Sequence, residues 1–239
     1  MSNVLAAKTA VTCESCNLDK LCIPKGLTRA DIGDLKLLVN RNNLRKKGEV
    51  IYHAGSPFRG IVALRSGSAK LVSFDRDGNE IIIDFILPGE LLGFDGVASQ
   101  IHNCSAVALE TVNFCHLPSR QIEALSVNNS AFQQILLQRS CDQFDVQIQR
   151  LMLNRRTAEE RVAFFILHIS ERLKARGYSE SEFRLSMSRE DIGNHLGIAH
   201  ETVSRIVKSF QAIEIIDIKA KQLKIIDKKK LFSYLDKPN

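Results

Sequence analysis

Three of the chain's six cysteines lie close together near its N-terminus, at Cys13, Cys16 and Cys22. Their C-x2-C-x5-C spacing puts three thiolates on one short segment, and thiolates are ligands of soft metals. Both zinc and an iron–sulfur cluster accept four thiolates, so three leave such a site one ligand short. Chance grouping of inert thiols is the alternative, but clustered terminal thiols are expected to be exposed and oxidisable. The spacing therefore predicts a metal or redox site and does not identify the metal.

Residues 188–211 form a second group that could do chemistry, in this case with nucleic acid. A short helix is predicted to end at Gly197, and a second helix follows with a polar, hydrogen-bonding first half. In that half, Arg205 can bond O6 and N7 of guanine, and Glu201 can accept from N4 of cytosine. The N-terminus of this helix, with Thr202, suits a phosphate group. The pattern is typical of a helix-turn-helix, and an ordinary corner between two helices is the alternative.

The distribution of charge favours nucleic acid as the partner. The 239-residue chain has a net charge of +6. Residues 155–239 hold 17 Lys and Arg against 12 Asp and Glu, whereas residues 1–154 hold 16 against 15. A basic C-terminal third attached to a near-neutral remainder is typical of a DNA-binding domain. For residues 219–230 alone, a solvated lysine-rich surface is the alternative.

Residues 50–118 are predicted to supply the scaffold that precedes the basic domain. A short helix over residues 28–38 comes first, and short β-rich runs separated by glycine turns follow. Asp77-Gly78 between two such runs predicts a hairpin. Because no segment with a helical pattern separates the strands, they are expected to form an antiparallel sandwich or barrel.

Residues 131–154 predict one long helix, since they contain neither proline nor glycine. Apolar residues recur along it at spacings of four and three, the pattern of a coiled-coil seam. The residues of this seam are Leu137, Cys141, Phe144, Ile148 and Leu151. Self-association through the seam is the favoured interpretation, and packing on the chain's own sheet is the alternative. A capping box at residues 157–160 opens the next helix, and residues 213–226 predict a β-hairpin wing.

Several classes of protein are excluded by what the sequence lacks. No apolar run approaches the ~20 residues of a membrane span, and the N-terminus has no secretory apolar region. A cytoplasmic location is therefore expected, where thiols favour metal or redox roles over structural disulfides. The sequence holds no P-loop, no HExxH motif and no recognisable nucleophile–base pair, so an enzyme is not expected.

With both ends interpreted, the chain resembles the Crp/Fnr superfamily of bacterial transcription regulators over nearly its full length. Within it, the chain is similar to the Fnr branch of oxygen sensors. The matching text is the cysteine segment through Cys22-Ile-Pro, then Pro88-Gly-Glu-Leu-Leu-Gly-Phe-Asp95, Ala158-Glu-Glu-Arg161, Glu182-Phe-Arg-Leu185, Asp191-Ile-Gly-Asn194 and Glu201-Thr-Val-Ser-Arg205. A helix-turn-helix alone would be weakly specific, but its combination with the cysteine cluster is highly specific.

The resemblance implies an α+β fold. It comprises an N-terminal antiparallel β-roll like a cyclic-nucleotide-binding domain, a long dimerisation helix and a C-terminal winged helix-turn-helix. The expected boundaries are 1–27 for the cysteine-rich segment, 28–128 for the β-roll, 129–155 for the dimerisation helix and 156–239 for the DNA-binding domain.

The resemblance also implies a [4Fe–4S] cluster held by four cysteines. By likeness these are Cys13, Cys16, Cys22 and Cys115, because Phe114-Cys115-His-Leu-Pro118 matches the place of the family's distal ligand. Cys104 and Cys141 do not match that place.

The family's DNA-contacting residues fall on the second helix of the motif and on the start of the first. They are Glu201, Ser204 and Arg205, with Arg189 as the phosphate contact of the first helix. His200 and Thr202, beside them at the start of the second helix, complete the set of residues predicted to contact DNA. Nucleotide-binding members hold a cyclic phosphate with a Gly-Glu turn and an Arg-Ser pair. Gly89-Glu90 is present here, but no arginine occurs between Arg76 and Arg120. A buried phosphate without its cation is hard to hold, so cyclic nucleotide is not expected as effector.

The expected function is that of an oxygen-responsive, homodimeric transcription regulator. Cluster assembly without oxygen would promote dimerisation and binding to double-stranded DNA at a palindrome resembling TTGAT-N4-ATCAA, with RNA polymerase as a further partner and no membrane. One alternative is a regulator of the same fold with a zinc or thiol-redox site. Another is a cyclic-nucleotide-binding regulatory subunit, which the missing arginine disfavours.

Overall fold

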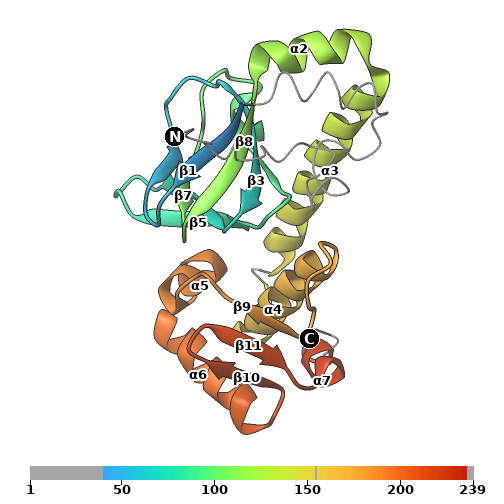
Figure 1. Cartoon of the computed structure of the whole chain (residues 1–239). Coiled ribbons are helices and arrows are strands. Elements are labelled where there is room, and N and C mark those ends of the chain that lie inside the picture. Colours follow the sequence, from blue (N-terminus) through green and yellow to red (C-terminus); the bar gives the residue numbers. More distant parts are fainter. Residues whose placement is uncertain (1–39, 154, 236–239) are drawn as a thin grey trace, which may run out of the picture.

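A computed structural model describes residues 40–153 and 155–235 of the chain (Figure 1). The three N-terminal cysteines and the helix expected over residues 28–38 lie outside the described residues. The described chain forms a β-rich domain, two helices that leave it, and a C-terminal domain of helices with a small sheet. None of the helices in these ranges is both long and apolar enough to cross a membrane.

Two four-stranded antiparallel sheets make up the β-rich domain. The first has the order β1 (Asn40–Arg45), β8 (Val112–Pro118), β3 (Gly60–Ser66) and β6 (Leu91–Leu92). The second has the order β2 (Val50–Tyr52), β7 (Ser105–Ala108), β4 (Ala69–Phe74) and β5 (Glu80–Ile86). Alternate apolar residues from both sheets form a buried cluster that includes Leu64, Leu92, Ala106 and Val112. A short 3-10 turn, η1 (Phe94–Gly96), follows β6.

The predicted hairpin is confirmed. Strands β4 and β5 pair antiparallel from Phe74↔Glu80 to Ala69↔Ile86, with Asp77-Gly78 in the connecting turn. Gly78 has φ 81°, a conformation that favours glycine. The antiparallel arrangement expected from the spacing of the strands is therefore present.

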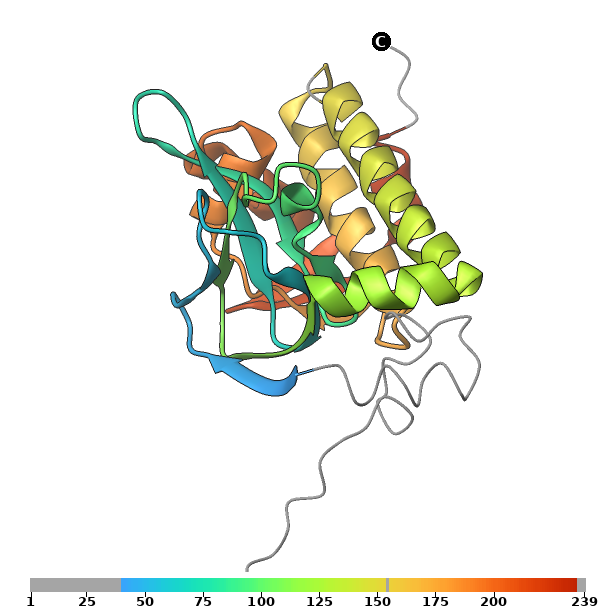
Figure 2. The ribbon, with the colours of Figure 1, turned by 90° about the horizontal axis from the view of Figure 1, so that it is seen from above.

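Two helices follow the last strand of the β-rich domain. They are α2 (Ser119–Asn128) and α3 (Ser130–Leu153), the latter matching the predicted helix to within one residue at each end. Phe132 and Ile135 near the start of α3 are buried. Further along, α3 lies beside α4 (Figure 2), and Val146 of α3 and Phe164 of α4 line a common pocket.

The C-terminal domain is a winged helix-turn-helix. It contains α4 (Ala158–Lys174), β9 (Glu182–Arg184), α5 (Arg189–Leu196), α6 (His200–Ala212), β10 (Ile216–Lys219), β11 (Gln222–Ile225) and α7 (Lys228–Phe232). The capping box at the start of α4 is present, with Thr157 N donating to Glu160 Oε2 at 2.7 Å and Thr157 Oγ1 accepting from Glu160 N at 3.3 Å. Strands β10 and β11 form the predicted wing, and β9 completes a three-stranded sheet.

Candidate functional site

The helix-turn-helix is built by α5, a tight turn and α6. Ser188 Oγ accepts from Asp191 N at 3.0 Å, and Asp191 Oδ2 accepts from Ser188 N at 2.8 Å, so a capping box begins α5. Gly197 ends it with φ 65°, as the sequence predicted. A Cβ added at Gly193 would lie 2.7 Å from the carbonyl oxygen of Ile198, so α5 and the turn approach too closely for any other residue. These constraints fix the angle between the two helices.

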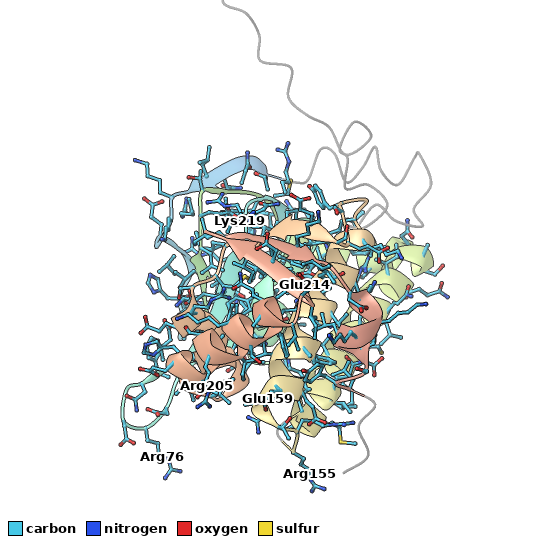
Figure 3. The ribbon with its side chains drawn as sticks, turned by 90° about the horizontal axis from the view of Figure 1, so that it is seen from below. Arg76, Arg155, Glu159, Arg205, Glu214 and Lys219 are labelled. Carbon is cyan, nitrogen blue, oxygen red and sulfur yellow. The ribbon has the colours of Figure 1, made fainter. Side chains whose placement is uncertain are left out.

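Helix α6 presents a polar face to solvent because its apolar face is fully used in packing. Val203, Ile206, Val207 and Phe210 are at most 4% exposed. On the opposite side, the side chains of Glu201 and His200 are 72% and 58% exposed. The other residues predicted to contact DNA are exposed Arg205 and half-buried Thr202 and Ser204. Figure 3 views the molecule from below, the side on which α6 and the wing lie, and labels Arg205 on α6.

Arg189 lies at the first position of α5, where the sequence placed a phosphate contact. The side chain is half-buried, and burial lowers its pKa from the usual value for arginine. It makes no ion pair with any residue whose side chain the structure describes. A guanidinium at the N-terminus of a helix is suited to a phosphate oxygen. The structure thus brings all six predicted DNA-contacting residues onto the two helices of the motif.

One face of α3 exposes the seam residues. Leu137, Phe144, Ile148 and Leu151 are between 44% and 68% exposed, and Cys141 is exposed as well. The alternative that this seam packs on the chain's own sheet is therefore wrong. A row of apolar side chains in water is unfavourable by about 25 cal/mol for each Å² of apolar surface, which favours a partner surface.

Among the described cysteines, Cys115 lies near both the N-terminal end of the described chain and the start of the long helix. It lies in β8, where it pairs with Ala63 of β3. Strand β1, whose first residue Asn40 pairs with His116, runs beside the same strand. The half-buried Cys115 packs against an apolar cluster that contains Phe132 of α3. A ligand at this position would connect the incoming chain with the start of α3.

Cys104 is in a different environment. Its side chain is only 4% exposed, although the sequence around it, Gln100-Ile-His-Asn-Cys104-Ser, is largely polar. Asp95 Oδ2 accepts from the backbone N–H groups of Asn103 and Cys104, at 2.8 and 3.3 Å, and holds this loop against the domain. Burial, followed by the charge of Asp95, raises the pKa of the Cys104 thiol to about 12. A thiol with this pKa stays protonated at neutral pH and is a poor metal ligand.

The described residues do not by themselves contain a metal site. Within residues 40–153 and 155–235, no three His, Cys, Asp or Glu side chains are grouped so as to hold a metal ion. Three of the four proposed ligands lie outside those ranges. A thiolate at Cys115 is nonetheless the donor that an iron–sulfur cluster requires.

The Gly89-Glu90 turn is occupied by two arginines of α4. Arg172 donates to Glu90 through Nε at 2.8 Å and Nη2 at 2.5 Å, and Arg176 also binds this carboxylate. Burial opposes ionisation of Glu90, but the two guanidinium groups outweigh it and hold the pKa of the carboxyl below its usual value. The sequence analysis missed these partners. Arg172 and Arg176 are four residues apart and share a helix face, but no local pattern indicates a carboxylate 82 residues earlier.

Comparison with known proteins shows similarity over most of the chain. A "Transcriptional activator protein Anr" from Pseudomonas protegens is 39% identical over 224 residues, which span 93% of this chain and 92% of that protein. An "Anaerobic regulatory protein" from Haemophilus influenzae is 38% identical over 219 residues, 91% of this chain and 85% of that protein. The solved structure of FixK2 from Bradyrhizobium japonicum has 25% sequence identity and a TM-score of 0.76, covering 82% of this chain and 96% of that one.

Two family descriptions match the two domains. The "Cyclic nucleotide-binding domain" matches residues 45–129, and the "Crp-like helix-turn-helix domain" matches residues 160–234. The chain therefore belongs to the Crp/Fnr family of DNA-binding transcription regulators. It is a regulator and not an enzyme, as the sequence predicted.

Proposed function

We propose that this chain is an oxygen-responsive regulator that binds palindromic DNA as a homodimer when a [4Fe–4S] cluster is bound. The position of Cys115 between β1 and the start of α3 is the observation that carries the proposal. Cys13, Cys16, Cys22 and Cys115 would hold the cluster, which supplies the reactivity towards oxygen. The name of the anaerobic regulatory protein to which the chain is similar supports the same response.

The proposed switch acts on dimerisation. Ligation at Cys115 would tie the N-terminal segment to β8 and stabilise the apolar cluster that holds Phe132 of α3. A fixed start of α3 would allow the exposed seams of two chains to pair, so that two copies of α6 lie about one DNA turn apart, ~34 Å. Loss of the iron–sulfur cluster in oxygen would release the N-terminal segment and weaken the dimer. A differential stability of a few kcal/mol, up to about 5.5, is enough to switch most of the population.

Cyclic nucleotide is not part of the proposal. Glu90, the carboxylate of the Gly-Glu turn, is already bound by Arg172 and Arg176. A nucleotide at this turn would have to displace two half-buried guanidinium groups, and the chain has no arginine between Arg76 and Arg120 to bind its phosphate. We further propose that the DNA-bound dimer interacts with RNA polymerase and that the protein is located in the cytoplasm.

Anaerobic purification tests the proposed function directly. We expect a brown protein with acid-labile sulfide that dimerises and shifts a TTGAT-N4-ATCAA duplex in a gel, and that loses colour and binding together in air. A scrambled duplex of the same composition is the control for the DNA. A colourless protein that contains zinc, or one that binds the palindrome equally with and without air, would contradict the proposal and favour the zinc or thiol-redox alternative.

Replacing Asp145 with alanine is expected to strengthen dimerisation of the cluster-free protein. Asp142 and Asp145 are exposed beside the seam, and pairing of two α3 helices would bring like charges near one another. Asp142 lies 3.6 Å from Arg139 of its own helix, whereas Asp145 makes no ion pair with any described side chain. The gain is expected to be about 0.2–1 kcal/mol, the usual interaction free energy of an exposed charge pair.

Analytical ultracentrifugation of the apo protein measures this change. The matched control is Asp142→Ala, which removes an acid already paired with Arg139 and should have the smaller effect. An Asp145→Ala dimer that is unchanged or weaker would show that this acid does not face its counterpart.

A further inference from the structure

The two domains share one continuous apolar core. A single buried cluster contains Val72, Ile82 and Phe85 of the β-rich domain together with residues of α4, α5 and α6. The ring of Phe85 is fully buried and packs edge-on against Phe165 of α4 at 5.9 Å between centroids. Separation of the domains would expose this surface to water, at about 25 cal/mol for each Å². The C-terminal domain is therefore docked on the β-rich domain and not merely tethered to it.

Half-buried charges fix α4 to the turn that follows β5. Arg172 and Arg176 are 14% and 8% exposed, and both bind Glu90, which is 19% exposed. Arg172 also lies 3.6 Å from Asp84, and Arg176 Nε donates to the carbonyl oxygen of Pro88 at 2.5 Å. Removing one partner from an ion pair that is largely shielded from water leaves an uncompensated charge, so this contact favours one geometry of the two domains.

A separate attachment fixes α5 to the edge of the second sheet. Among the residues that the structure describes, strand β5 is the last strand of that sheet, so part of its backbone has no neighbouring strand. Asn194 of α5 takes the place of one: its Oδ1 accepts from Ile82 N at 2.7 Å, and its Nδ2 donates to Glu80 O at 2.6 Å. Nearby, Lys70 of β4 lies 3.0 Å from Asp191 of α5. Figure 1 shows α5 below the end of the sheet that carries β5.

The two attachments together determine where α6 lies. Helix α6 packs on both α4 and α5, so its position follows from the positions of those helices. The docking leaves the polar face of α6 exposed, with Glu201 and Arg205 in solvent. We propose that Glu90, Arg172, Arg176 and Asn194 are positioning residues that set the separation of the two α6 helices in the dimer and thereby the half-site spacing that the protein accepts. This inference rests on the proposed binding of a palindrome by a homodimer.

The physical basis is effective concentration. When one protomer holds its half-site, a rigid domain presents the second α6 at one separation only, and a loosened domain samples many. Loosening therefore lowers affinity for the best spacing and raises relative affinity for other spacings. It leaves the binding of one α6 to one half-site unchanged, because the residues that contact bases are not altered.

The test compares Glu90→Gln and Asn194→Ala with the wild type, each as full-length anaerobic dimer, on duplexes with central spacers of two to six base pairs. We expect about tenfold weaker binding at the best spacer, a spacer preference at least threefold flatter, and unchanged affinity for an isolated half-site. The control is Glu180→Gln, whose carboxylate binds only Lys174 and Lys228 within the C-terminal domain among the described residues. Asn194→Ala keeps the test valid if Glu90→Gln does not fold.

A second measurement separates this inference from the proposed function. Without DNA, Asn194→Ala should increase hydrogen–deuterium exchange in the peptide that covers β5, because the hydrogen bonds from Ile82 N to Asn194 Oδ1 and from Asn194 Nδ2 to Glu80 O are lost. An unchanged spacer profile in both variants would overturn the inference, as would an equal loss of affinity at every spacer and at the isolated half-site. Failure of the wild type to bind any palindrome would instead overturn the proposed function, while exchange in β5 still reports the attachment.

Discussion

A Cys115→Ser protein is expected to assemble no oxygen-labile cluster and to lose anaerobic DNA binding. Serine oxygen is a harder and far less acidic donor than a thiolate, so a four-thiolate site loses one ligand. The same result is expected for Ser at Cys13, Cys16 or Cys22. Cys115 also packs against the group of apolar side chains that contains Phe132 of α3. Loss of ligation at this position would therefore also remove the connection between the proposed metal site and α3.

The other two cysteines are the matched controls. Cys104→Ser should keep both the cluster and DNA binding, since the Cys104 thiol is buried and protonated and cannot serve as a ligand without rearrangement of the loop held by Asp95. Cys141→Ser should also keep both, with a weaker dimer as the only expected change. Cys141 is exposed in the single chain, and its proposed place is in the seam between Leu137 and Phe144.

Anaerobic reconstitution of all six variants provides the measurement. Iron and sulfide content is determined first, and a gel shift with the palindrome follows with and without air. If Cys104→Ser lost the cluster and Cys115→Ser kept it, the assignment of Cys115 as the fourth ligand would be wrong. If all four ligand variants bound DNA normally with and without air, the proposed sensing mechanism would be wrong and only the proposed DNA binding would remain.

Local features of the fold were accessible from the sequence because short-range physical chemistry determines them. The capping box at Thr157 satisfies helix N–H groups within three residues. The αL conformation of Gly197 and the hairpin at Asp77-Gly78 likewise need only their own neighbours. The long helix α3 follows from the absence of any helix-breaking residue.

Contacts between distant segments could not be predicted. Lys70 and Asp191 are 121 residues apart, and Asn194 meets Ile82 across 112 residues. Periodicity reports which face of an element is apolar but not which other element covers it. The burial of Cys104 was missed for the same reason, since Asp95 folds a polar loop inward through hydrogen bonds with no local signature.

Arg205→Ala is expected to weaken binding to the cognate palindrome by about 1–3 kcal/mol for each half-site. For a dimer this corresponds to a loss of roughly 30-fold to 10⁴-fold in affinity, at 1.4 kcal/mol for each tenfold. The loss on random DNA should be much smaller, because a bidentate bond to guanine O6 and N7 exists only at the cognate base. Arg205 is exposed on α6, so its removal should leave the stability of the fold nearly unchanged.

Lys208→Ala is the matched control, since Lys208 is exposed on the same helix one turn further along. A lysine that contacts phosphate should weaken binding to cognate and random duplexes alike and reduce the slope of log affinity against log salt by about one for each protomer. Fluorescence anisotropy at several salt concentrations on both duplexes separates the two behaviours. Equal losses for Arg205→Ala on cognate and random DNA would reduce Arg205 to a phosphate contact, because specificity requires a contact that only one base sequence can make.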